Sequence, residues 1–450
     1  MRVHFIAIGG SAMHNLAIAL HLKGFNVTGS DDEIFEPSKS RLNKHGLLPK
    51  TEGWKPQIIT DELDAIILGM HARKDNPELL RAQELGLKIY SYPEYLYEQT
   101  KDKRRVVIGG SHGKTTTTAM VMHVLQQLNM DFDYMVGAQL EGFDTMVKLT
   151  KDAPIAVFEG DEYLSSPIDL TPKFHWYKPH VAMLTGIAWD HMNVFPTWEN
   201  YTSQFTKFAD SIEGNGTLIY FDDDDELEII ASKQSQIQTI AYNTIDSTNV
   251  DGQTIVQWDG QSYPMEIFGN HNLQNLNGAR LVCNQLGIDD DTFLKAMQSF
   301  KGAAKRLQLL KKNDTANIYL DFAHSPSKLK ATTSAMKQQF TKRKLIAVME
   351  LHTFSSLNKD FLPQYKNTMD EADKAVVFFN PEVLKHKKLP KITEQDVLSA
   401  FGRKDLKVLT DSNELVTWLK AQDYDSTNLL IMTSGNFSGL DIKQLTSELI

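Results

Sequence analysis

The sequence predicts an α/β protein with three domains, each built on a mainly parallel sheet flanked by helices. Its length of 450 residues is about three times that of a typical domain. Short apolar runs alternate with helix-length segments along the chain, a pattern typical of parallel sheets. Glycine-rich turns follow two of these runs, at Gly9-Gly10 and Gly109-Gly110. We expect the domains at residues 1–103, 104–303 and 304–450.

Composition excludes several classes of protein. With 41% hydrophobic and 23% charged residues, the chain is that of a folded protein rather than a disordered one. Its net charge of −10 argues against a broad electrostatic grip on nucleic acid or anionic lipid. A single cysteine, Cys283, can form neither an internal disulfide nor a zinc cluster. No apolar stretch reaches 18 residues, so we expect a cytoplasmic protein with no nucleic-acid or membrane partner.

The first domain opens with a strand, a turn and a helix. Residues 3–8 form an apolar run that ends at Gly9-Gly10-Ser11, and helically spaced apolar residues follow up to Leu22. Further strands are expected through Val27 and at 65–68 and 87–90. This βαβ opening predicts a Rossmann-like sheet. The polar, charged stretch 97–105 indicates a linker.

The second and third domains repeat the alternation of strands and helices. In the second, strands are expected at 106–108, 155–158, 181–184 and 217–221. Residues 239–268 combine alternating apolar residues with Asp-Gly turns, which favours a small antiparallel patch, and a helix follows at 272–286. In the Rossmann-like third domain, strands are expected at 317–320, 345–349, 374–379, 406–409 and 429–432.

The sharpest chemical signal is Gly109-Gly110-Ser111-His112-Gly113-Lys114-Thr115-Thr116, between an apolar strand and a helical pattern that begins near Thr117. Ile108 stands where the long P-loop motif has glycine, so this is the shortened form Gly-x-x-Gly-Lys-Thr. Backbone N–H groups at a helix N-terminus, with the Lys114 ammonium, form a cradle for phosphate. The Thr115 hydroxyl can bind Mg²⁺. The central domain is therefore predicted to be a P-loop domain with a phosphate-binding site.

Magnesium ligands are expected at the ends of neighbouring strands. Glu159 directly follows the strand at 155–158, and His191 follows the strand at 181–184. The carboxyl ends of parallel strands face one ligand crevice, so both side chains can reach a metal near the phosphate loop. The alternatives are that His191 is structural, that Glu162 and Asp190 cap helices, and that the acidic run 222–225 is a solvated turn.

Six ordered motifs give the chain a wider resemblance. They are Gly110-Ser111-His112-Gly113-Lys114-Thr115, Glu159-Gly160-Asp161-Glu162-Tyr163, Asp190-His191, Gly269-Asn270-His271-Asn272-Leu273-Gln274-Asn275, Lys305-Arg306 and Asp321-Phe322-Ala323-His324-Ser325-Pro326. In these motifs the chain resembles the Mur ligases, ATP-dependent enzymes that form amide bonds in peptidoglycan precursor synthesis. The resemblance covers all three expected domains.

The resemblance implies a role for each matching position. It makes Lys114, Glu159 and His191 catalytic, with Thr115 and Glu159 on one Mg²⁺ and His191 on a second. The residues implied to bind ATP are Gly110, Ser111, His112, Gly113, Lys114, Thr115, Thr116, Asn272, Asn275, Arg306, Asp321 and His324. Asn272 and Asn275 would contact adenine, although Asn272 can also be a helix N-cap. The residues implied to bind a UDP-sugar are Gly9, Gly10, Ser11, Ala12, Met13, Ser30 and Asp31.

Within this family, three stretches indicate the amine substrate. Asp161-Glu162-Tyr163, residues 174–179 and Ser434-Gly435-Asn436-Phe437 are similar to the murein-peptide-recycling members. The main expectation is therefore that L-alanyl-γ-D-glutamyl-meso-diaminopimelate is joined to the lactyl carboxylate of UDP-N-acetylmuramate through an acyl phosphate. The alternative is the same reaction with L-alanine. Leu164, Trp189 and Ser325 depart from the family pattern.

Other features remain open at this stage. His352 is a possible helper for deprotonating the amine, or simply a surface imidazole. Where some family members carry a carbamylated lysine this chain has Phe205, with Lys207 out of register, so no modification is expected. We expect a monomer or a weak homo-oligomer. An alternative of another class is a non-enzymatic P-loop switch, which would leave the turn at Gly9-Gly10 unexplained.

Overall fold

A computed structural model describes residues 1–189, 194–250, 252–303 and 306–450 of the chain. In these ranges the strands form four sheets, and the chain divides into two compact units. One unit contains residues 1–243 and 274–297, and the other contains 244–273 and 298–450. The domain boundaries expected near 103 and 303 stay predictions.

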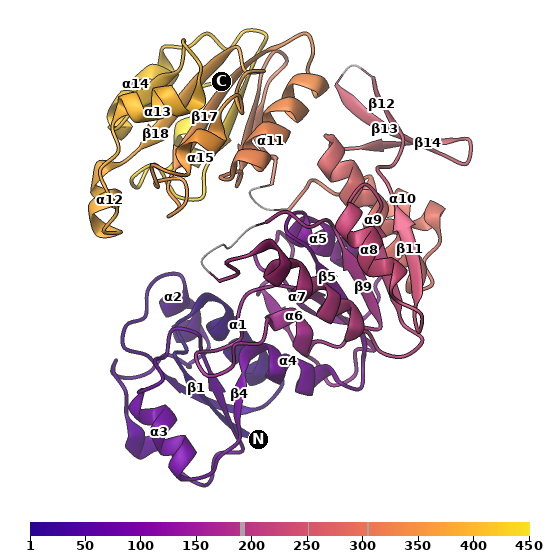
Figure 1. The fold of residues 1–450 in the computed structure, drawn as a ribbon, viewed down its shortest axis with the longest axis vertical. Helices are drawn as coiled ribbons and strands as arrows, with labels where there is room; N and C mark the ends of the chain where they lie inside the picture. The colour runs from indigo at the N-terminus through magenta and orange to yellow at the C-terminus, as the bar shows by residue number, and fades with distance from the viewer. Residues whose placement is uncertain (190–193, 251, 304–305) are drawn as a thin grey trace. The chain divides into compact units, whose positions relative to one another are not determined.

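The N-terminal sheet is parallel throughout, with strand order β2-β1-β3-β4. Its strands β1 and β4 are labelled in Figure 1. Its elements are β1 (Arg2–Ile6), α1 (Ser11–Leu22), β2 (Asn26–Ser30), α2 (Ser38–Lys44), the 3-10 helix η1 (Pro56–Ile58), β3 (Ala65–Leu68), α3 (Pro77–Glu84), β4 (Ile89–Ser91) and α4 (Tyr92–Thr100). Strand β3 is apolar and fully buried, as expected for a parallel strand covered on both faces. The turns after β1 and β2 therefore lie at the same edge of this sheet.

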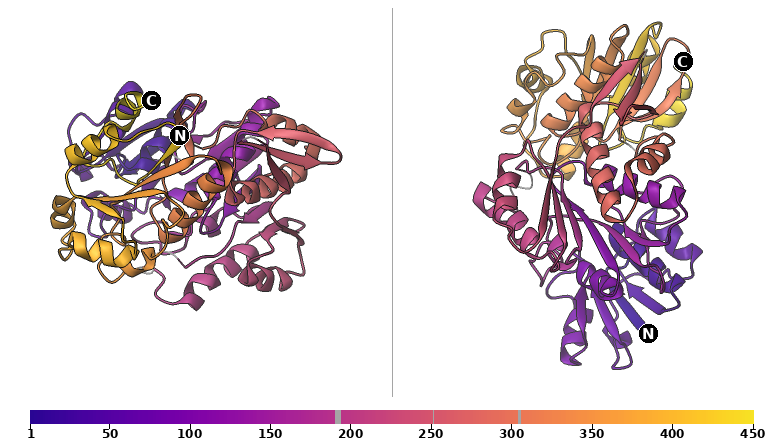
Figure 2. Two further views of the ribbon diagram at one scale, coloured as in Figure 1. Left: turned by 90° about the horizontal axis from the view of Figure 1, so that it is seen from above. Right: turned by 90° about the vertical axis from the view of Figure 1, so that its right-hand side faces the viewer.

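The central sheet places β5 between β9 and β8, in the order β11-β10-β9-β5-β8-β6-β7. Only β7 runs antiparallel among its described strands, which lie side by side in the right-hand view of Figure 2. The elements are β5 (Arg104–Gly109), α5 (Lys114–Gln127), β6 (Phe132–Met135), β7 (Val147–Lys148), β8 (Ile155–Glu159), α6 (Lys173–Trp176), β9 (Val181–Leu184), α7 (Trp198–Asp210), β10 (Thr217–Phe221), α8 (Asp225–Ser232), β11 (Gln238–Tyr242), α9 (Asn270–Gln285) and α10 (Asp290–Met297).

The second unit holds two sheets. A three-stranded antiparallel sheet consists of β12 (Ser247–Val250), β13 (Gln253–Trp258) and β14 (Gln261–Met265). The larger sheet has the order β15-β16-β20-β17-β18-β19 and is parallel except at β15. Its elements are β15 (Gln308–Lys312), β16 (Asn317–Asp321), α11 (Pro326–Gln339), β17 (Lys344–Leu351), the 3-10 helix η2 (Leu362–Tyr365), β18 (Lys374–Phe379), α12 (Pro381–His386), α13 (Glu394–Phe401), β19 (Lys407–Leu409), α14 (Ser412–Lys420), β20 (Thr427–Met432) and α15 (Ile442–Ser447).

The structure confirms the α/β class with mainly parallel sheets and corrects several local predictions. The stretch 97–105 is not an open linker, because α4 extends to Thr100 and Arg105 is a fully buried part of β5. Helix α5 begins at Lys114 rather than near Thr117. Residues 238–242 join the central sheet as parallel strand β11, so the antiparallel patch covers only 247–265. Sequence analysis missed β6, β7 and β15, since none stands out as an isolated apolar run.

Arg105 explains why a charged stretch is buried. Its guanidinium donates to backbone carbonyls that lie before and after it in the sequence, including Lys101 O at 2.7 Å and Tyr177 O at 2.8 Å. Its Nη2 also donates to Glu213 Oε1 at 3.2 Å. Several fixed donors matched to carbonyl acceptors compensate for the desolvation of the charge. This arrangement fixes the connection between α4 and β5.

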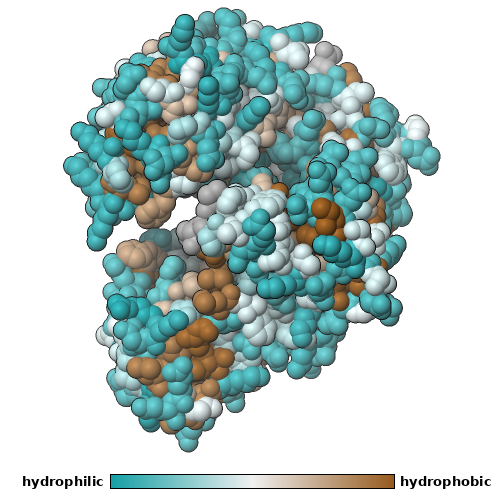
Figure 3. Space-filling model, in the orientation of Figure 1, coloured by the Kyte–Doolittle hydropathy of each residue, from teal (hydrophilic) through white to brown (hydrophobic). Residues whose placement is uncertain are grey.

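The surface carries scattered apolar side chains. Figure 3 shows a mostly hydrophilic face with a group of hydrophobic side chains over the N-terminal part of the chain. Large exposed examples include Phe35, Leu170 and Phe354. Among the residues searched, no helix is both long and apolar enough to cross a membrane.

We expect Asp133→Asn to destabilise the first unit by about 3–5 kcal/mol. Lys103 Nζ lies 2.6 Å from Asp133 Oδ2, and the two side chains are 7% and 0% exposed, so the substitution leaves a buried ammonium without its counter-charge. Urea unfolding followed by circular dichroism measures the loss. The matched control is Lys295→Ala, which breaks an exposed pair of 2.7 Å and should cost less than about 0.5 kcal/mol. Equal losses in the two variants would contradict the argument.

Candidate functional site

A glycine-rich loop connects β5 to α5 at the centre of the first unit. Gly110 and Gly113 have φ of +124° and +83°, a region that L side chains rarely adopt. A Cβ at Gly110 would lie 2.2 Å from Thr185 Oγ1, and one at Gly113 would lie 2.4 Å from Asn275 Oδ1. Only glycine therefore fits at both places. The loop and the first turn of α5 have the strand, glycine turn and helix geometry on which the phosphate-site prediction rests.

Lys114 is the first residue of α5 and its side chain is almost fully buried. Its Nζ donates to Glu162 Oε2 at 2.8 Å and to Gly110 O at 2.7 Å. Burial alone would lower the pKa of Lys114, but the carboxylates of Glu162, Asp161 and Glu159 outweigh burial and raise this pKa. The loop therefore holds a permanent positive charge.

Thr115 and Glu159 meet beside the cradle. Thr115 Oγ1 donates to Glu159 Oε1 at 2.8 Å, and Gly137 N–H donates to Glu159 Oε2 at 2.7 Å. Burial, reinforced by the nearby Asp161 carboxylate, raises the pKa of Glu159 above its usual value. A hydroxyl and a carboxylate at this place are the hard oxygen ligands that Mg²⁺ prefers.

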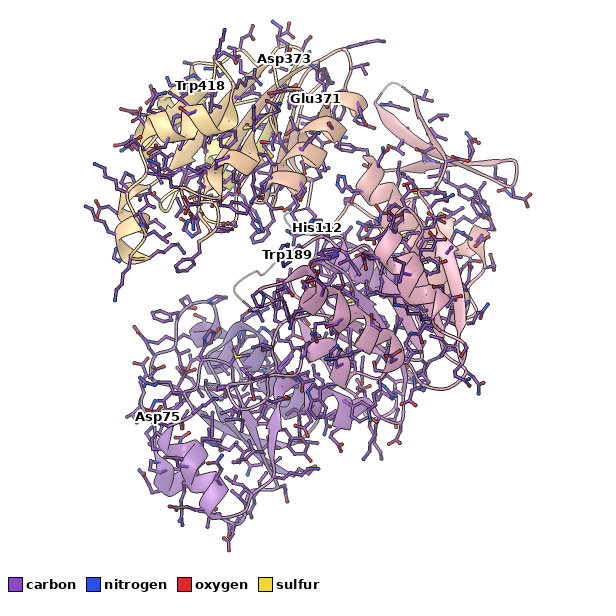
Figure 4. All side chains as sticks on the ribbon, viewed as in Figure 1. Asp75, His112, Trp189, Glu371, Asp373 and Trp418 are labelled. Carbon is purple, nitrogen blue, oxygen red and sulfur yellow. The ribbon has the colours of Figure 1, made fainter. Side chains whose placement is uncertain are left out.

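The residues after β9 close the other side of the loop. Ser111 N–H donates to Gly186 O at 2.9 Å, and Ala188 N–H donates to Ser111 Oγ at 2.8 Å. Thr185 Oγ1 donates to His112 O. Figure 4 labels His112 and Trp189, which belong to these two segments. Of the acidic run 222–225, Asp224 accepts from Ile187 N–H at 2.5 Å and from Leu227 N–H at the start of α8.

The two asparagines implied to bind adenine lie on α9. Asn275 is buried next to Gly113 in the first unit, as the distance above shows. Asn272 is also buried, and its Nδ2 donates to Phe268 O at 2.9 Å in the second unit. Asn272 is the third residue of α9 and its side-chain amide donates, whereas an N-cap side chain precedes the helix and accepts a backbone N–H, so the helix-capping alternative is wrong.

The N-terminal turn is tied to the end of β2. Gly9 N–H donates to Asp31 Oδ2 at 2.7 Å, and both Ser30 and Asp31 are buried. Burial, together with the neighbouring Asp32, raises the pKa of Asp31 to about 6. Ser11, Ala12 and Met13 form the first turn of α1. The residues implied to bind a UDP-sugar thus gather at the carboxyl edge of the N-terminal sheet.

The second unit places Arg306, Asp321 and His324 close together. Asp321 accepts from Thr332 Oγ1 at 2.6 Å and from Leu307 N–H at 3.3 Å. The Arg306 guanidinium lies 4.8 Å from the centre of the Phe322 ring, and this ring meets His324 edge-on at 5.0 Å. His352 Nδ1 lies 3.7 Å from Glu350 Oε1 at the end of β17. Asp190, His191 and Lys305 fall outside the described residues.

Two residues of the loop region were not assigned a role by sequence. Glu162, which sequence analysis weighed only as a helix cap, instead pairs with Lys114. Tyr201 contacts both Ser111 and Glu162 with its hydroxyl. Glu162 lies three residues after Glu159 in a recognised motif, so its position was a usable signal. Tyr201 carries no such signal, because a tyrosine on the buried face of a helix normally indicates core packing.

The donor set limits how a metal could be bound. Among the residues searched, no three His, Cys, Asp or Glu side chains gather into a cluster that could hold a metal ion. Thr115 and Glu159 alone are an incomplete set. Mg²⁺ commonly binds through one or two protein oxygens with phosphate oxygens and water as the remaining ligands. Thr115 and Glu159 therefore fit a Mg²⁺ ion whose remaining ligands include phosphate oxygens and water.

Three family models match the chain in succession. The model described as "Mur ligase family, catalytic domain" matches residues 2–104, "Mur ligase middle domain" matches 108–283, and "Mur ligase, glutamate ligase domain" matches 305–436. Together they span the phosphate loop, the N-terminal turn and the Arg306–His324 group.

The names of proteins and solved structures that are similar to this chain are consistent with these three family models. A UDP-N-acetylmuramate–L-alanine ligase from Caldicellulosiruptor bescii is 32% identical over 392 residues, which cover 83% of this chain and 82% of that one. A UDP-N-acetylmuramate-alanine ligase structure from Thermotoga maritima has a TM-score of 0.73 at 22% identity and covers 97% of this chain and 96% of its own. A murein peptide ligase structure from Psychrobacter arcticus has a TM-score of 0.66 at 22% identity and covers 100% and 98%. These structures are similar in fold.

We expect the free energy of unfolding of Asp31→Asn, relative to that of the parent protein, to increase as the pH rises. The folded protein holds the Asp31 proton up to a pKa of about 6, against an ordinary value of 3.8, so its free energy of unfolding falls as pH rises between these values. Asparagine lacks this titration, and its oxygen can still accept from Gly9 N–H. The difference should increase by up to about 3 kcal/mol from pH 4 to pH 7. Denaturant unfolding at several pH values measures it, and a difference independent of pH would contradict the shifted pKa.

Proposed function

The chain belongs to the Mur ligase family of ATP-dependent, amide-forming ligases of peptidoglycan synthesis, and we propose that it joins L-alanine to the lactyl carboxylate of UDP-N-acetylmuramate. The family membership confirms the resemblance drawn from the sequence. The observation that supports L-alanine is the set of curated relatives, such as that of Caldicellulosiruptor bescii, which are named as L-alanine ligases. It favours the alternative of the sequence analysis over the tripeptide.

In the proposed reaction the lactyl carboxylate must be activated, because a carboxylate is a poor electrophile. A carboxylate does not react with an amine in water, so the lactyl carboxylate first attacks the γ-phosphorus of ATP. The bond from this phosphorus to the β,γ-bridging oxygen breaks, ADP leaves, and the carboxylate becomes an acyl phosphate. The amine then displaces phosphate and forms the amide. Negative charge develops on phosphoryl oxygens in the first step, where the Lys114 ammonium and the loop amides can stabilise it.

Thr115 and Glu159 are the residues that would hold Mg²⁺ in this proposal, since their oxygens meet beside the cradle. A bound Mg²⁺ supplies charge neutralisation and orientation of the phosphates. His191 is proposed as a further ligand on the strength of its motif. Asn275 and Gly113 form the adjoining wall, where the family resemblance places the nucleotide.

The other two sequence domains supply the remaining substrates in this proposal. The turn at Gly9-Gly10 lies at the carboxyl edge of a parallel sheet, a typical place for a diphosphate, and a Cβ at Gly9 would lie 2.9 Å from Asp31 Oδ2. In the second unit, the carboxyl ends of β17 and β20 carry Glu350, His352 and Thr433. We propose this edge for the incoming amine, with His352 as a candidate proton acceptor.

A second candidate acceptor is L-alanyl-γ-D-glutamyl-meso-diaminopimelate. It is favoured by Asp161-Glu162-Tyr163 and by the long stretch 164–179, in which Leu164 bridges Pro172 and Trp176 Nε1 donates to Asp169 Oδ2 at 2.9 Å. These contacts order a long segment that directly follows the Asp161-Glu162-Tyr163 motif. The reaction chemistry is the same for either acceptor.

Acceptor-dependent phosphate release tests the proposal. With Mg-ATP and UDP-N-acetylmuramate present, we expect L-alanine to raise phosphate release and to yield an amide product by mass spectrometry. The tripeptide in place of L-alanine is the parallel arm, and a larger kcat/KM with tripeptide would move the assignment to the second candidate. Slow hydrolysis that ignores both the sugar and the amine would favour a non-enzymatic switch.

We expect Lys114→Ala to lower the ligation rate by about 10²–10³-fold, because it removes a preorganised charge from the phosphate cradle. The substitution also leaves the buried Glu162 carboxylate without its partner, which costs stability. The double variant Lys114→Ala/Glu162→Gln removes both charges and serves as the control for folding. Near-normal turnover in either variant, measured by amide formation, would refute the role of Lys114.

A further inference from the structure

We propose that Tyr201 is a positioning residue that holds the Glu162 carboxylate on Lys114 and thereby limits the affinity of the empty loop for nucleotide phosphates. The inference rests on the proposed function in one respect, that residues 109–114 bind those phosphates. It assigns a role to a residue outside the recognised motifs.

The hydroxyl of Tyr201 is held in a fixed place. Tyr201 lies in the first turn of α7, whose N-terminus is capped by Thr197, and its side chain is fully buried. Its ring meets Phe205 edge-on at 5.2 Å and Phe195 at 5.5 Å. A ring packed on several sides loses little further entropy when its hydroxyl forms hydrogen bonds. The packing of its ring therefore holds the Tyr201 hydroxyl in place beside the phosphate loop.

A chain of hydrogen bonds runs from the loop through this hydroxyl to Glu162. Tyr201 OH lies 2.9 Å from Ser111 Oγ and donates to Glu162 Oε1 at 3.4 Å, while Glu162 Oε2 accepts from Lys114 Nζ at 2.8 Å. A carboxylate beside an ammonium can only accept, so the Tyr201 proton points to Glu162. With the Tyr201 proton used in this way, Ser111 Oγ is the donor to Tyr201 OH, and Ser111 Oγ itself accepts from Ala188 N–H. Each hydrogen bond in this series therefore donates in the direction of Glu162.

These hydrogen bonds engage the two side-chain donors with which a bound phosphate would interact. The Lys114 ammonium is engaged by Glu162 and Gly110 O, and the Ser111 hydroxyl is turned toward Tyr201. Glu162 thus acts as an internal anion in the cradle, and an arriving phosphate must compete with it for Lys114. Each donor that stabilises the carboxylate in place raises the free-energy cost of that exchange.

Tyr201→Phe removes the hydroxyl and leaves the packed ring. We expect this variant to bind metal-free ADP about fivefold more tightly than the parent protein, the effect of one lost hydrogen bond to the competing anion. Glu162→Gln should bind it about tenfold more tightly or better, since the anion itself is removed. Isothermal titration with ADP in EDTA measures both, and the absence of metal keeps Thr115 and Glu159 out of the comparison.

Double substitution separates positioning from a merely structural effect. If Tyr201 acts through Glu162, then Tyr201→Phe in the Glu162→Gln background should change the ADP affinity less than twofold. The matched control is Tyr177→Phe, which removes a hydroxyl that is also fully buried in this unit and has no hydrogen-bond partner among the described residues. This control should leave the ADP affinity unchanged.

Several outcomes would overturn the inference. Unchanged or weaker ADP binding in Tyr201→Phe would do so, as would an equal effect with and without Glu162. If Tyr201→Phe fails to fold, Glu162→Gln alone decides, because weaker or unchanged binding in that variant removes the competing anion from the account. Absence of ADP binding by the parent protein is a different result, since it contradicts the nucleotide site and with it the proposed function.

Discussion

The structure of the central domain depends on keeping one ammonium charged inside a buried loop. Lys114 is removed from water, a condition that favours its neutral form, yet it lies among the carboxylates of Glu162, Asp161 and Glu159. Glu159 and Glu162 are themselves buried and need donors. Thr115, Gly137 and Tyr201 supply them, so the charge of one lysine determines the hydrogen-bonding of residues on four separate segments.

The sheet topology brings these segments together. Strand β5 leads into the phosphate loop, and its two neighbours β8 and β9 end at Glu159 and just before Thr185. Because all three strands are parallel, their carboxyl ends meet at one edge, where a functional site can be built from residues far apart in the sequence. The N-terminal sheet repeats this arrangement with Gly9 and Asp31, and the larger sheet of the second unit repeats it with Asp321, Glu350 and Thr433.

Each of these edges contains a buried carboxylate that accepts backbone N–H groups. Asp31 accepts from Gly9, Glu159 from Gly137, and Glu350 from Phe437 at 3.0 Å. A buried carboxylate is costly unless donors satisfy it, so each one fixes the loop that supplies the donor. The same residues therefore shape the loops and set their electrostatic potential, and a ligand that binds there meets a site that is already organised.

Local sequence patterns correctly predicted the α/β class, many of the buried strands and the glycine-rich turn before α5. These depend on local patterns: apolar runs long enough for buried strands, and glycines beside Lys114 that only a tight turn before a helix requires. Boundaries were less accurate where a charged residue is buried, as at Arg105, because its partners are carbonyls that no local pattern reveals. Edge strands such as β7 and β15 were missed for a related reason, since their pairing depends on a neighbouring strand.

Only the tertiary structure decided which carboxylate faces Lys114 and what holds it there. Glu159, Asp161 and Glu162 are nearly adjacent in the sequence, and their spacing does not say that Glu159 turns to Thr115 while Glu162 turns to Lys114. Tyr201 reaches the same place from a helix about ninety residues after the loop. Hydrogen bonds of this kind depend on the relative placement of packed elements, and that placement is fixed by the whole core and not by any single segment.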